Sequence, residues 1–493
     1  MKRIAYLFAV MLAVAGCATS TAPSEQMEAQ LRFKDGKFKV IQFTDIHWGW
    51  DVNPSDVRSN IMGAAEAEKP QLLVFTGDLI TGAGDLSVAK AEWTELLSIA
   101  DATGVPYAVV MGNHDAECCD GMCADTIETW VSEIGKNCIN YPSEHTEIFG
   151  HGNKTLPVYS EKGDKVSALV YVLDSNDYPL GQHSFASHYD WIHPDQVAWY
   201  IEESNKYKAQ NGGDPLPALA YYHICVPEYN IVKEVSYYGH YLEPCCPGEI
   251  NTGFFSAAYF QGDIMGMFVG HDHTNDYCLV HKGIALCYGR QSGVAGMDPN
   301  TPRGCRVVEM TEGVRGFRTW VRTEAGGAET SWLYPAGISA DAQVDMKPAQ
   351  DIEVAGNGVK TRYFEGTAKD RTVDQMTVED NFKSESVTPG FDIDRNNLKN
   401  HFGYIFDTWF LAENDGVYRF DVNSDDGSVL FVDDEKVIDL DGSHSADIAD
   451  ALVGLKKGYH HIVVKYFDDS ESQTLDIDVN FRPIPESLLF VKK

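Results

Sequence analysis

Short apolar runs alternate with segments of helical spacing through residues 31–320. The runs are rich in Val, Ile, Tyr and Phe, which is typical of strands that are buried on both faces. They occupy residues 38–45, 71–78, 106–115, 167–175, 217–224 and 264–272. Between them, segments such as 54–69 and 89–104 carry apolar residues at the spacing of an amphipathic helix. This regular alternation predicts a layered α/β domain over residues 31–320.

The pattern changes towards the C-terminus. Residues 321–359 are rich in Ala, Gly, Asp and Pro and show little periodicity, so we expect a linker there. From residue 360, short runs alternate apolar and polar positions between turn residues, as in 416–422, 428–434, 459–467 and 474–481. Such spacing favours an all-β sandwich domain, which we place at residues 360–485.

The first 17 residues have the order of a targeting signal. "MKR" is followed by "IAYLFAVMLAVAG", which is shorter than the roughly 20 apolar residues that a spanning helix needs. "VAGC" resembles the lipobox of bacterial lipoproteins, and this implies a signal peptide over residues 1–17 with a lipid on Cys17. An ordinary secretory signal that is cut nearby is the alternative. We therefore expect a tether over residues 18–30 and a lipid-anchored protein of the bacterial cell envelope, in the outer membrane, periplasmic or surface-facing.

Charge and cysteine content narrow the possible partners. The chain has 73 acidic and 39 basic residues and a formal net charge of −34, which argues against nucleic acid as a partner. The chain has 11 cysteines, and ten of them remain when Cys17 is set aside. An even number permits disulfides in an exported chain. "CCDGMC" lacks the paired spacing of a zinc knuckle, so disulfides are the preferred interpretation.

Polar side chains follow the apolar runs at the predicted carboxyl ends of the strands, the edge at which α/β sheets bind ligands. They are Asp45, His47, Asp78, Asn113, His114, His223, His271 and His273. Aspartate, asparagine and histidine without a thiolate favour Mn, Fe or Zn as divalent or trivalent ions. These are too many ligands for one tetrahedral zinc ion, but they suit two ions that share a carboxylate. Such a pair clamps phosphoryl oxygens and generates hydroxide at neutral pH, which hydrolyses phosphate esters.

These blocks resemble the signature of the calcineurin-like metallophosphoesterase superfamily, in which DxH, GD, GNH(D/E), H and GHxH follow one another. The resemblance implies a β-sandwich flanked by helices. It also implies one metal held by Asp45, His47, Asp78 and His273, and a second held by Asp78, Asn113, His223 and His271. Asp78 would bridge the two ions, and His114 would protonate the leaving oxygen.

Stretches such as "HICVPEY" and "FVGHDHTNDYC" narrow the resemblance to phosphatases grouped as purple-acid-phosphatase-like. The chain departs from true purple acid phosphatases at Thr81, where those enzymes place a tyrosine ligand. We expect Asp272 to support the ligands beside it, and Asn275 and Arg290 to contact phosphate.

The C-terminal segment, with "DGVYRFDVNSDDGSVLFVDDEKVIDLDG", resembles the protective-antigen-type β-sandwich domain. Asp425 and Asp426 match the adjacent aspartates that bind Ca²⁺ in its sugar-binding members, and acidic oxygen-rich loops suit this ion. A tight turn that needs no ion is the alternative.

Taken together, the resemblances predict an exported phosphomonoesterase that acts on a phosphorylated small molecule or glycan, with an appended domain that binds glycan or cell wall. Two alternatives stay open. The enzyme could be a phosphodiesterase that acts on cyclic nucleotides or lipid head groups. Alternatively, the protein could be a glycan-binding adhesin whose phosphoesterase domain is inactive.

Overall fold

The computed structural model describes residues 30–49, 53–82, 84–117, 123–179, 183–293, 301–367, 371–393, 400–470 and 472–493. The predicted signal peptide with Cys17, and residues 18–29 of the predicted tether, lie outside these residues. Among the described residues, no helix combines the length and the apolar character needed to span a membrane.

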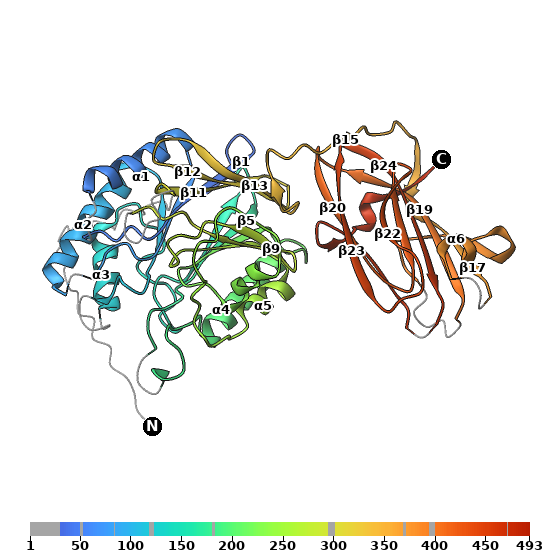
Figure 1. The fold of residues 1–493 in the computed structure, drawn as a ribbon. Coiled ribbons are helices and arrows are strands. Elements are labelled where there is room, and N and C mark those ends of the chain that lie inside the picture. The colour runs from blue at the N-terminus through green and yellow to red at the C-terminus, as the bar shows by residue number, and fades with distance from the viewer. Residues whose placement is uncertain are drawn as a thin grey trace, which may run out of the picture. The chain divides into compact units, whose positions relative to one another are not determined.

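Two β-sheets form the centre of the N-terminal domain (Figure 1). The strands of the first sheet are, in spatial order, β14 (Ile338–Ser339), β13 (Ala328–Tyr334), β12 (Phe317–Thr323), β11 (Gly304–Thr311), β1 (Lys37–Phe43), β2 (Leu72–Thr76) and β3 (Tyr107–Val110). Those of the second are β4 (Lys154–Tyr159), β5 (Val166–Val172), β6 (Ala218–Tyr221), β8 (Ile264–Val269), β10 (Ile284–Tyr288), β9 (Cys278–His281) and β7 (Tyr237–Tyr238). Strands β1, β2 and β3 are parallel, as are β5, β6, β8 and β10, so their carboxyl ends point the same way within each sheet.

Helices cover the outer faces of both sheets. They are α1 (Pro54–Glu68), α2 (Leu86–Ala102) and α3 (Ala124–Ile134) on the first sheet, and α4 (Pro194–Gln210), α5 (Phe254–Gln261) and the 3₁₀ helix η3 (Pro227–Lys233) on the second. Figure 1 shows α1, α2 and α3 grouped apart from α4 and α5. The Asn53 and Asp85 side chains begin α1 and α2 by accepting hydrogen bonds from backbone N–H groups of the first turn.

Side chains alternate along each strand between two interfaces, one between the two sheets and one between a sheet and its helices. On β1, Val40 faces the second sheet and Ile41 faces the helices, and Leu72 and Leu73 divide in the same way on β2. Each central strand is therefore buried on both faces, which explains its continuous apolar sequence. The result is an α/β/β/α arrangement, and the predicted fold class is confirmed.

The C-terminal domain is an all-β sandwich, as predicted. One sheet holds β15 (Met346–Lys347), β23 (Asp447–Leu455), β20 (Gly416–Asp425), β25 (Thr474–Val479) and β26 (Arg482–Pro483). The other holds β16 (Val354–Asn357), β27 (Leu489–Lys492), β19 (Phe402–Ala412), β24 (Gly458–Asp468), β21 (Ser428–Val432) and β22 (Glu435–Leu440), with β17 (Val359–Glu365) between β19 and β18 (Phe382–Thr388). Short helical turns are α6 (Val373–Met376), η4 (Glu379–Asn381) and η5 (Glu486–Leu488). Phe406, Phe420, Leu430 and Val464 are among the side chains that fill the space between the sheets.

The structure corrects the linker that we expected over residues 321–359. Strands β13 and β14 extend the first sheet of the N-terminal domain, and β15 and β16 pair inside the C-terminal domain. On β13, Trp332 and Tyr334 are buried while Ala328 and Glu329 are exposed. A strand that buries a few residues of one face needs little apolar sequence, so its composition resembled that of a loop.

The cysteines also differ from the expectation. Cys123 is disulfide-bonded, whereas the seven cysteines 138, 225, 245, 246, 278, 287 and 305 are free. Cys225, Cys278 and Cys287 are buried among apolar side chains, where a thiol packs as a small hydrophobic group. Cys118 and Cys119 lie outside the described residues. An even number of cysteines therefore did not indicate an extensive disulfide framework.

Candidate metal centre

The predicted ligands meet because they follow strands of both sheets. Asp45 and His47 follow β1, Asp78 follows β2 and Asn113 follows β3, all in the first sheet. His223 follows β6, and His271 and His273 follow β8, in the second sheet. The seven residues thus come from the carboxyl ends of five strands.

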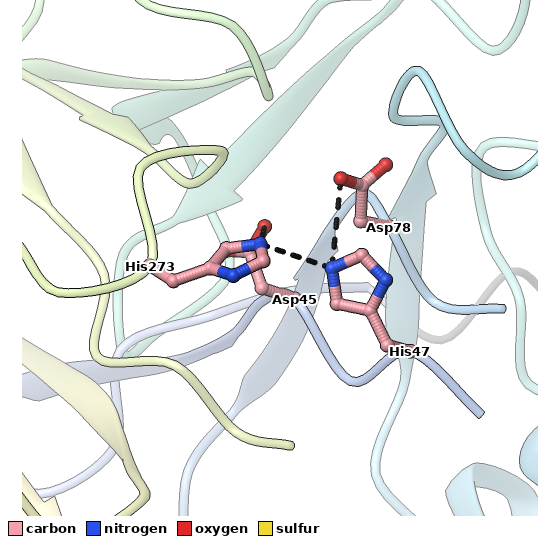
Figure 2. Close-up of side chains that lie close together, drawn as sticks. All are labelled: Asp45, His47, Asp78 and His273. Carbon is pink, nitrogen blue, oxygen red and sulfur yellow. Dashed lines mark hydrogen bonds and ion pairs between the residues drawn. The ribbon is translucent and has the colours of Figure 1, made fainter. Parts of the chain in front are cut away.

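One group of ligand atoms belongs to Asp45, His47, Asp78 and His273, and these atoms all lie within 4.8 Å of one another (Figure 2). The Nε2 atoms of His47 and His273 are 3.0 Å apart. His47 Nε2 lies 3.8 Å from Asp78 Oδ2, and His273 Nε2 lies 3.6 Å from Asp45 Oδ1. Two carboxylates and two imidazoles therefore converge on one small volume.

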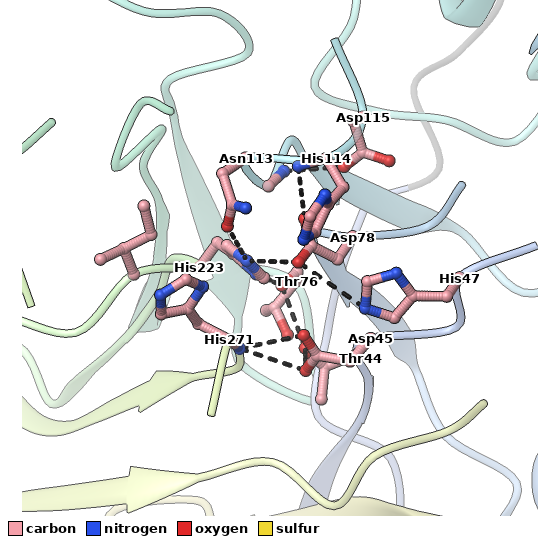
Figure 3. A network of polar contacts seen from close by, with 12 residues as sticks. Thr44, Asp45, His47, Thr76, Asp78, Asn113, His114, Asp115, His223 and His271 are labelled. Atoms are coloured by element: carbon pink, nitrogen blue, oxygen red, sulfur yellow. Dashed lines mark hydrogen bonds and ion pairs between the residues drawn. The ribbon is translucent and has the colours of Figure 1, made fainter. Parts of the chain in front are cut away.

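A second group belongs to Asp78, His223 and His271, again within 4.8 Å. His223 Nε2 lies 3.2 Å from Asp78 Oδ2 and 3.3 Å from Asn113 Oδ1 (Figure 3). Asp78 belongs to both groups, and its side chain is almost fully buried. A carboxylate shared by two groups of ligands is the arrangement that two neighbouring ions require.

The backbone at these residues has a rare conformation. Asp45, His47, Asp78 and His271 have φ angles of 52°, 50°, 50° and 76°. Residues other than glycine seldom adopt positive φ, and such strain is concentrated at functional sites. The turns bring the chain so close that a Cβ atom at Gly112 would lie 2.3 Å from Asp78 Oδ1. Gly112 is therefore required by the close approach.

Hydrogen bonds fix the orientation of the ligands. His223 Nδ1 donates to the Thr76 carbonyl oxygen at 2.7 Å, so Nε2 is the ring nitrogen that faces Asp78 and Asn113. The Asp45 carboxylate accepts hydrogen bonds from the Thr44 hydroxyl, at 2.7 Å, and from the His271 backbone N–H. Asp78 Oδ1 accepts from the backbone N–H of His114 at 2.9 Å.

The electrostatics of the site also fit a pair of cations. Burial lowers the pKa of both His47 and His271 to about 3, so these imidazoles are neutral and keep a lone pair for an ion. Although burial opposes it, the neighbouring histidines hold the pKa of Asp78 below its usual range. Two neutral imidazoles and the ionised carboxylate of Asp78 form a donor set that suits Mn, Fe or Zn. The residues present therefore fit two metal ions.

His114 belongs to neither group of ligands. Its ring centroid lies 5.3 Å from that of His47, and its side chain keeps about a third of its surface exposed, at 32%. Burial lowers its pKa, but Asp78 and a hydrogen bond with Glu117 outweigh burial and raise the pKa above its usual value. His114 therefore combines access to the solvent side of the site with a tendency to carry a proton.

Known proteins resemble this chain in sequence. The calcineurin-like phosphoesterase family matches residues 38–275, and the PA14 domain family matches residues 356–484. The chain is 31% identical over 311 residues to probable inactive purple acid phosphatase 14 of Arabidopsis thaliana, which covers 57% of this chain and 77% of that protein. It is 31% identical over 364 residues to probable inactive purple acid phosphatase 29 of the same plant, covering 64% of this chain and 90% of that protein. The chain belongs to the calcineurin-like phosphoesterase family.

A third relative has a different name. The phosphatase DCR2 of Saccharomyces cerevisiae is 29% identical to the chain over 337 residues, which make up 60% of this chain and 55% of that protein. The predicted family is confirmed, and so is the C-terminal domain, since the protective-antigen-type sandwich is the PA14 domain.

Three further predicted residues have protein partners in the phosphoesterase domain. Asp272 is buried, and its Oδ2 accepts hydrogen bonds from the Tyr288 hydroxyl at 2.5 Å and the Cys246 N–H at 3.1 Å. Asn275 Oδ1 accepts from the Leu242 N–H at 2.9 Å. These contacts brace the loop after β8. Asp272 thus supports the two histidines beside it through the loop, whereas the contacts of Asn275 favour a structural role.

The contacts of Arg290 likewise favour a structural role. Arg290 is almost fully buried, and its Nε donates to Asp276 Oδ2 at 2.8 Å. Its Nη1 donates to the Pro302 carbonyl at 2.6 Å, and its Nη2 also pairs with Asp276. A guanidinium held this way has few donors left for phosphate, so the phosphate contact expected of Arg290 is not favoured by its geometry.

The PA14 domain contains a second concentration of buried carboxylates, which we call the acidic cluster. It consists of Asp425, Asp426, Asp468 and Asp469. Asp426 accepts hydrogen bonds from the Ser443 hydroxyl and the Asp469 N–H. Neither oxygen of the fully buried Asp468 has a hydrogen-bond partner among the described residues. Burial and the other three aspartates raise the pKa of Asp468 to about 7.

Sequence reasoning missed residues that touch the centre from outside the motifs. The Tyr178 hydroxyl lies 3.0 Å from Asn113 Nδ2, and Glu117 Oε2 lies 2.8 Å from His114 Nδ1. Glu117 is three residues after His114, a spacing that could have drawn attention to it. Tyr178 is in a loop after β5 and carries no sequence signal. Asp468 directly follows the run 459–467 and was not predicted as a site residue.

Proposed function

We propose that the phosphoesterase domain is a metal-dependent phosphomonoesterase with a two-metal centre formed by Asp45, His47, Asp78, Asn113, His223, His271 and His273. One observation carries this proposal: Asp78 is shared by both groups of ligand atoms. The name of one relative, the phosphatase DCR2, agrees with hydrolysis of phosphate esters.

Each part of the reaction has a residue suited to it. Two ions held here would stabilise the charge on the phosphoryl oxygens and lower the pKa of water. Asp78 would help to hold both ions, and the backbone N–H of His114 orients its carboxylate. His114 would donate a proton to the departing oxygen, because it lies beside the ligands without belonging to them.

The proposal is tested with the purified full chain. Elemental analysis should find close to two ions of Mn, Fe or Zn per chain after reconstitution. The protein should then release phosphate from an aryl monophosphate. Failure to bind metal, together with no hydrolysis after addition of each metal, would overturn the proposal.

A phosphodiesterase is the alternative within the same chemistry, because the ligand set is common to both reactions. Parallel assays on an aryl monophosphate and its bis-aryl ester separate them. A higher kcat/KM for the bis-ester would reassign the substrate class to cyclic nucleotides or lipid head groups.

An inactive phosphoesterase domain is the alternative of another class. It is favoured by the names of two relatives, which are called probable inactive phosphatases. Against it, all seven ligand positions of this chain carry side chains that can bind metal, and they lie close together. If metal binds and no ester is hydrolysed, the protein would instead act through its PA14 domain.

The PA14 domain is proposed to bind Ca²⁺ through Asp425 and Asp426, with Asp468 as a further ligand, and to hold a glycan or the cell wall. The support is the acidic cluster, in which a buried carboxylate lacks any hydrogen-bond partner in the described part of the domain. A cation would satisfy those oxygens. Calorimetric titration with Ca²⁺, followed by a glycan panel with and without Ca²⁺, tests both parts.

Export and a lipid on Cys17 are proposed from the order of charged, apolar and small residues over 1–17. Lipidation would place the enzyme at the bacterial envelope, near extracellular or periplasmic substrates. Substitution of Cys17 by serine should release the protein from the membrane fraction. If the fractionation of the variant matches that of the wild type, the anchor is not at Cys17.

A further inference from the structure

A chain of hydrogen bonds outside the family motifs connects the candidate acid with a candidate ligand. His114 Nδ1 lies 2.8 Å from Glu117 Oε2. The Tyr178 hydroxyl donates to Glu117 Oε1 at 3.0 Å, and Asn113 Nδ2 donates to the Tyr178 oxygen at 3.0 Å. Glu117 therefore accepts on both of its oxygens, and Tyr178 both donates and accepts.

For His114, this contact decides which nitrogen faces the reaction. With Nδ1 held by the carboxylate, Nε2 is the nitrogen that remains for a substrate. The ring also gains a fixed direction, although the side chain is 32% exposed. An imidazole with one nitrogen held by a carboxylate is oriented before substrate arrives, which lowers the cost of proton transfer.

For Asn113, the same chain decides the orientation of the amide. The Tyr178 oxygen accepts from the NH₂ group, and the carbonyl oxygen is thereby turned towards His223, 3.3 Å from its Nε2. If the amide were turned over, the NH₂ group would face His223 and could not bind a cation. Tyr178 thus selects the one orientation in which Asn113 is a ligand.

We propose that Tyr178 and Glu117 are positioning residues, Tyr178 for the ion bound by Asn113 and Glu117 for proton donation by His114. The part that concerns Glu117 rests on the proposed phosphoesterase function, whereas the part that concerns Tyr178 requires only metal binding. The two residues share a hydrogen bond, so each also stabilises the other's orientation.

Metal binding tests Tyr178 without reference to activity. Apoprotein is titrated with Mn²⁺ by equilibrium dialysis. Tyr178→Phe should raise the dissociation constant of one of the two Mn²⁺ ions by about 10-fold to 100-fold, which is usual when the hydrogen-bond partner of a metal ligand is removed. The dissociation constant of the other ion should stay unchanged. Asn113→Ala marks which ion is affected. Glu147→Gln is the control, because Glu147 pairs with His145 at 3.2 Å in a similar contact that touches none of the ligands.

Substrate dependence tests Glu117. Glu117→Gln should lower kcat for both an alkyl phosphate and 4-nitrophenyl phosphate, and the loss should be about 10-fold greater for the alkyl phosphate. The reason is that nitrophenolate is a good leaving group and needs little protonation. KM and metal content should stay unchanged. In a His114→Ala background, Glu117→Gln should cause no further loss, because the group that it positions is gone.

The outcomes are distinct. If Tyr178→Phe lowers the affinity for both Mn²⁺ ions equally, or for neither of them, the role of Tyr178 is overturned. An equal loss of kcat on both esters, or a loss that adds to that of His114→Ala, would overturn the role of Glu117. If the wild type hydrolyses no ester, the proposed function and the role of Glu117 fail together, and the Mn²⁺ titration still decides the role of Tyr178.

Discussion

The metal centre and the acidic cluster both bury several carboxylates, yet the neighbours of those carboxylates differ. At the centre, imidazoles lie between the carboxylates, and His223 Nε2 is 3.2 Å from Asp78 Oδ2. The pKa of Asp78 is held low there, although burial opposes it. In the acidic cluster, burial and the neighbouring aspartates raise the pKa of Asp468 to about 7.

On the proposals above, the metal centre would be organised before an ion arrives, whereas the acidic cluster would need its ion. Nitrogen and oxygen ligands held by backbone turns suit a transition metal, and they are already close together. Oxygen ligands that repel one another suit Ca²⁺, which would remove the repulsion. Four predictions test or sharpen this distinction, from the largest expected effect to the smallest.

Removal of the shared carboxylate should have the largest effect. Asp78→Ala takes a ligand from both groups and leaves the backbone N–H of His114 without its acceptor. We expect metal content to fall to near zero and phosphate release to be undetectable. Elemental analysis and the aryl phosphate assay measure this, and retention of both ions in Asp78→Ala would contradict a bridging role.

Removal of the proposed proton donor should separate chemistry from metal binding. His114→Ala is expected to lower kcat by roughly 10²-fold to 10⁴-fold, the usual contribution of a general acid, with metal content nearly unchanged. The measurement is kcat beside metal content for the same preparation. If His114→Ala and Asp78→Ala lose metal equally, His114 is a ligand and the roles assigned here are wrong.

Substitution in the acidic cluster should change the stability of the PA14 domain differently in the absence and in the presence of Ca²⁺. Asp468→Asn removes a buried carboxylate that lacks a hydrogen-bond partner among the described residues, so it should stabilise the PA14 domain in chelator. In Ca²⁺ at 100 times its dissociation constant, the wild type gains about 2.7 kcal/mol, and the variant should gain less. Scanning calorimetry of the full chain under both conditions measures the reversal. Identical Ca²⁺ responses would remove Asp468 from the site.

The smallest effect concerns pH in the PA14 domain. Burial lowers the pKa of His460, but hydrogen bonds to Asp433 at 2.7 Å and the Lys456 carbonyl at 2.8 Å outweigh burial and raise it. A histidine whose pKa is raised in the folded state stabilises that state. This stabilisation is fully present below the ordinary histidine pKa of about 6.5 and is lost as the pH rises through the pKa of the folded state. The unfolding temperature of this domain should therefore fall above about pH 6.5.

The control for that prediction is His460→Gln, whose side chain does not titrate. In this variant, the decrease in unfolding temperature with rising pH should be smaller than in the wild type. Equal slopes in the two proteins would show that His460 does not cause the pH dependence.

Much of the metal centre could be predicted from the sequence, because each ligand follows a buried strand closely. Asp78 comes two residues after β2 and His223 two residues after β6, so strand prediction alone places each at the carboxyl end of its strand. The strands themselves were visible because burial on both faces demands continuous apolar sequence. The pairing of two sheets, which brings the two sets of ligands together, came from the family resemblance.

The remainder depends on loops and on side-chain contacts that have no periodic signal. Tyr178 reaches Asn113 from a loop 65 residues away in sequence. Arg290 was expected at phosphate, yet a buried carboxylate, Asp276, holds it. The strands within 321–359 were missed because they bury few residues. Five of the seven free cysteines are buried, and a buried thiol gives the same sequence signal as a paired one.

The candidate metal centre joins the two sheets and draws its ligands from residues 45 to 273. No short segment of the chain contains a complete set, so the site exists only after most of the N-terminal domain has folded and the two sheets have paired. Metal acquisition is then a late step of folding, and ions bound there would hold the finished sheets together. The compartment in which folding ends would therefore decide which metal the protein carries.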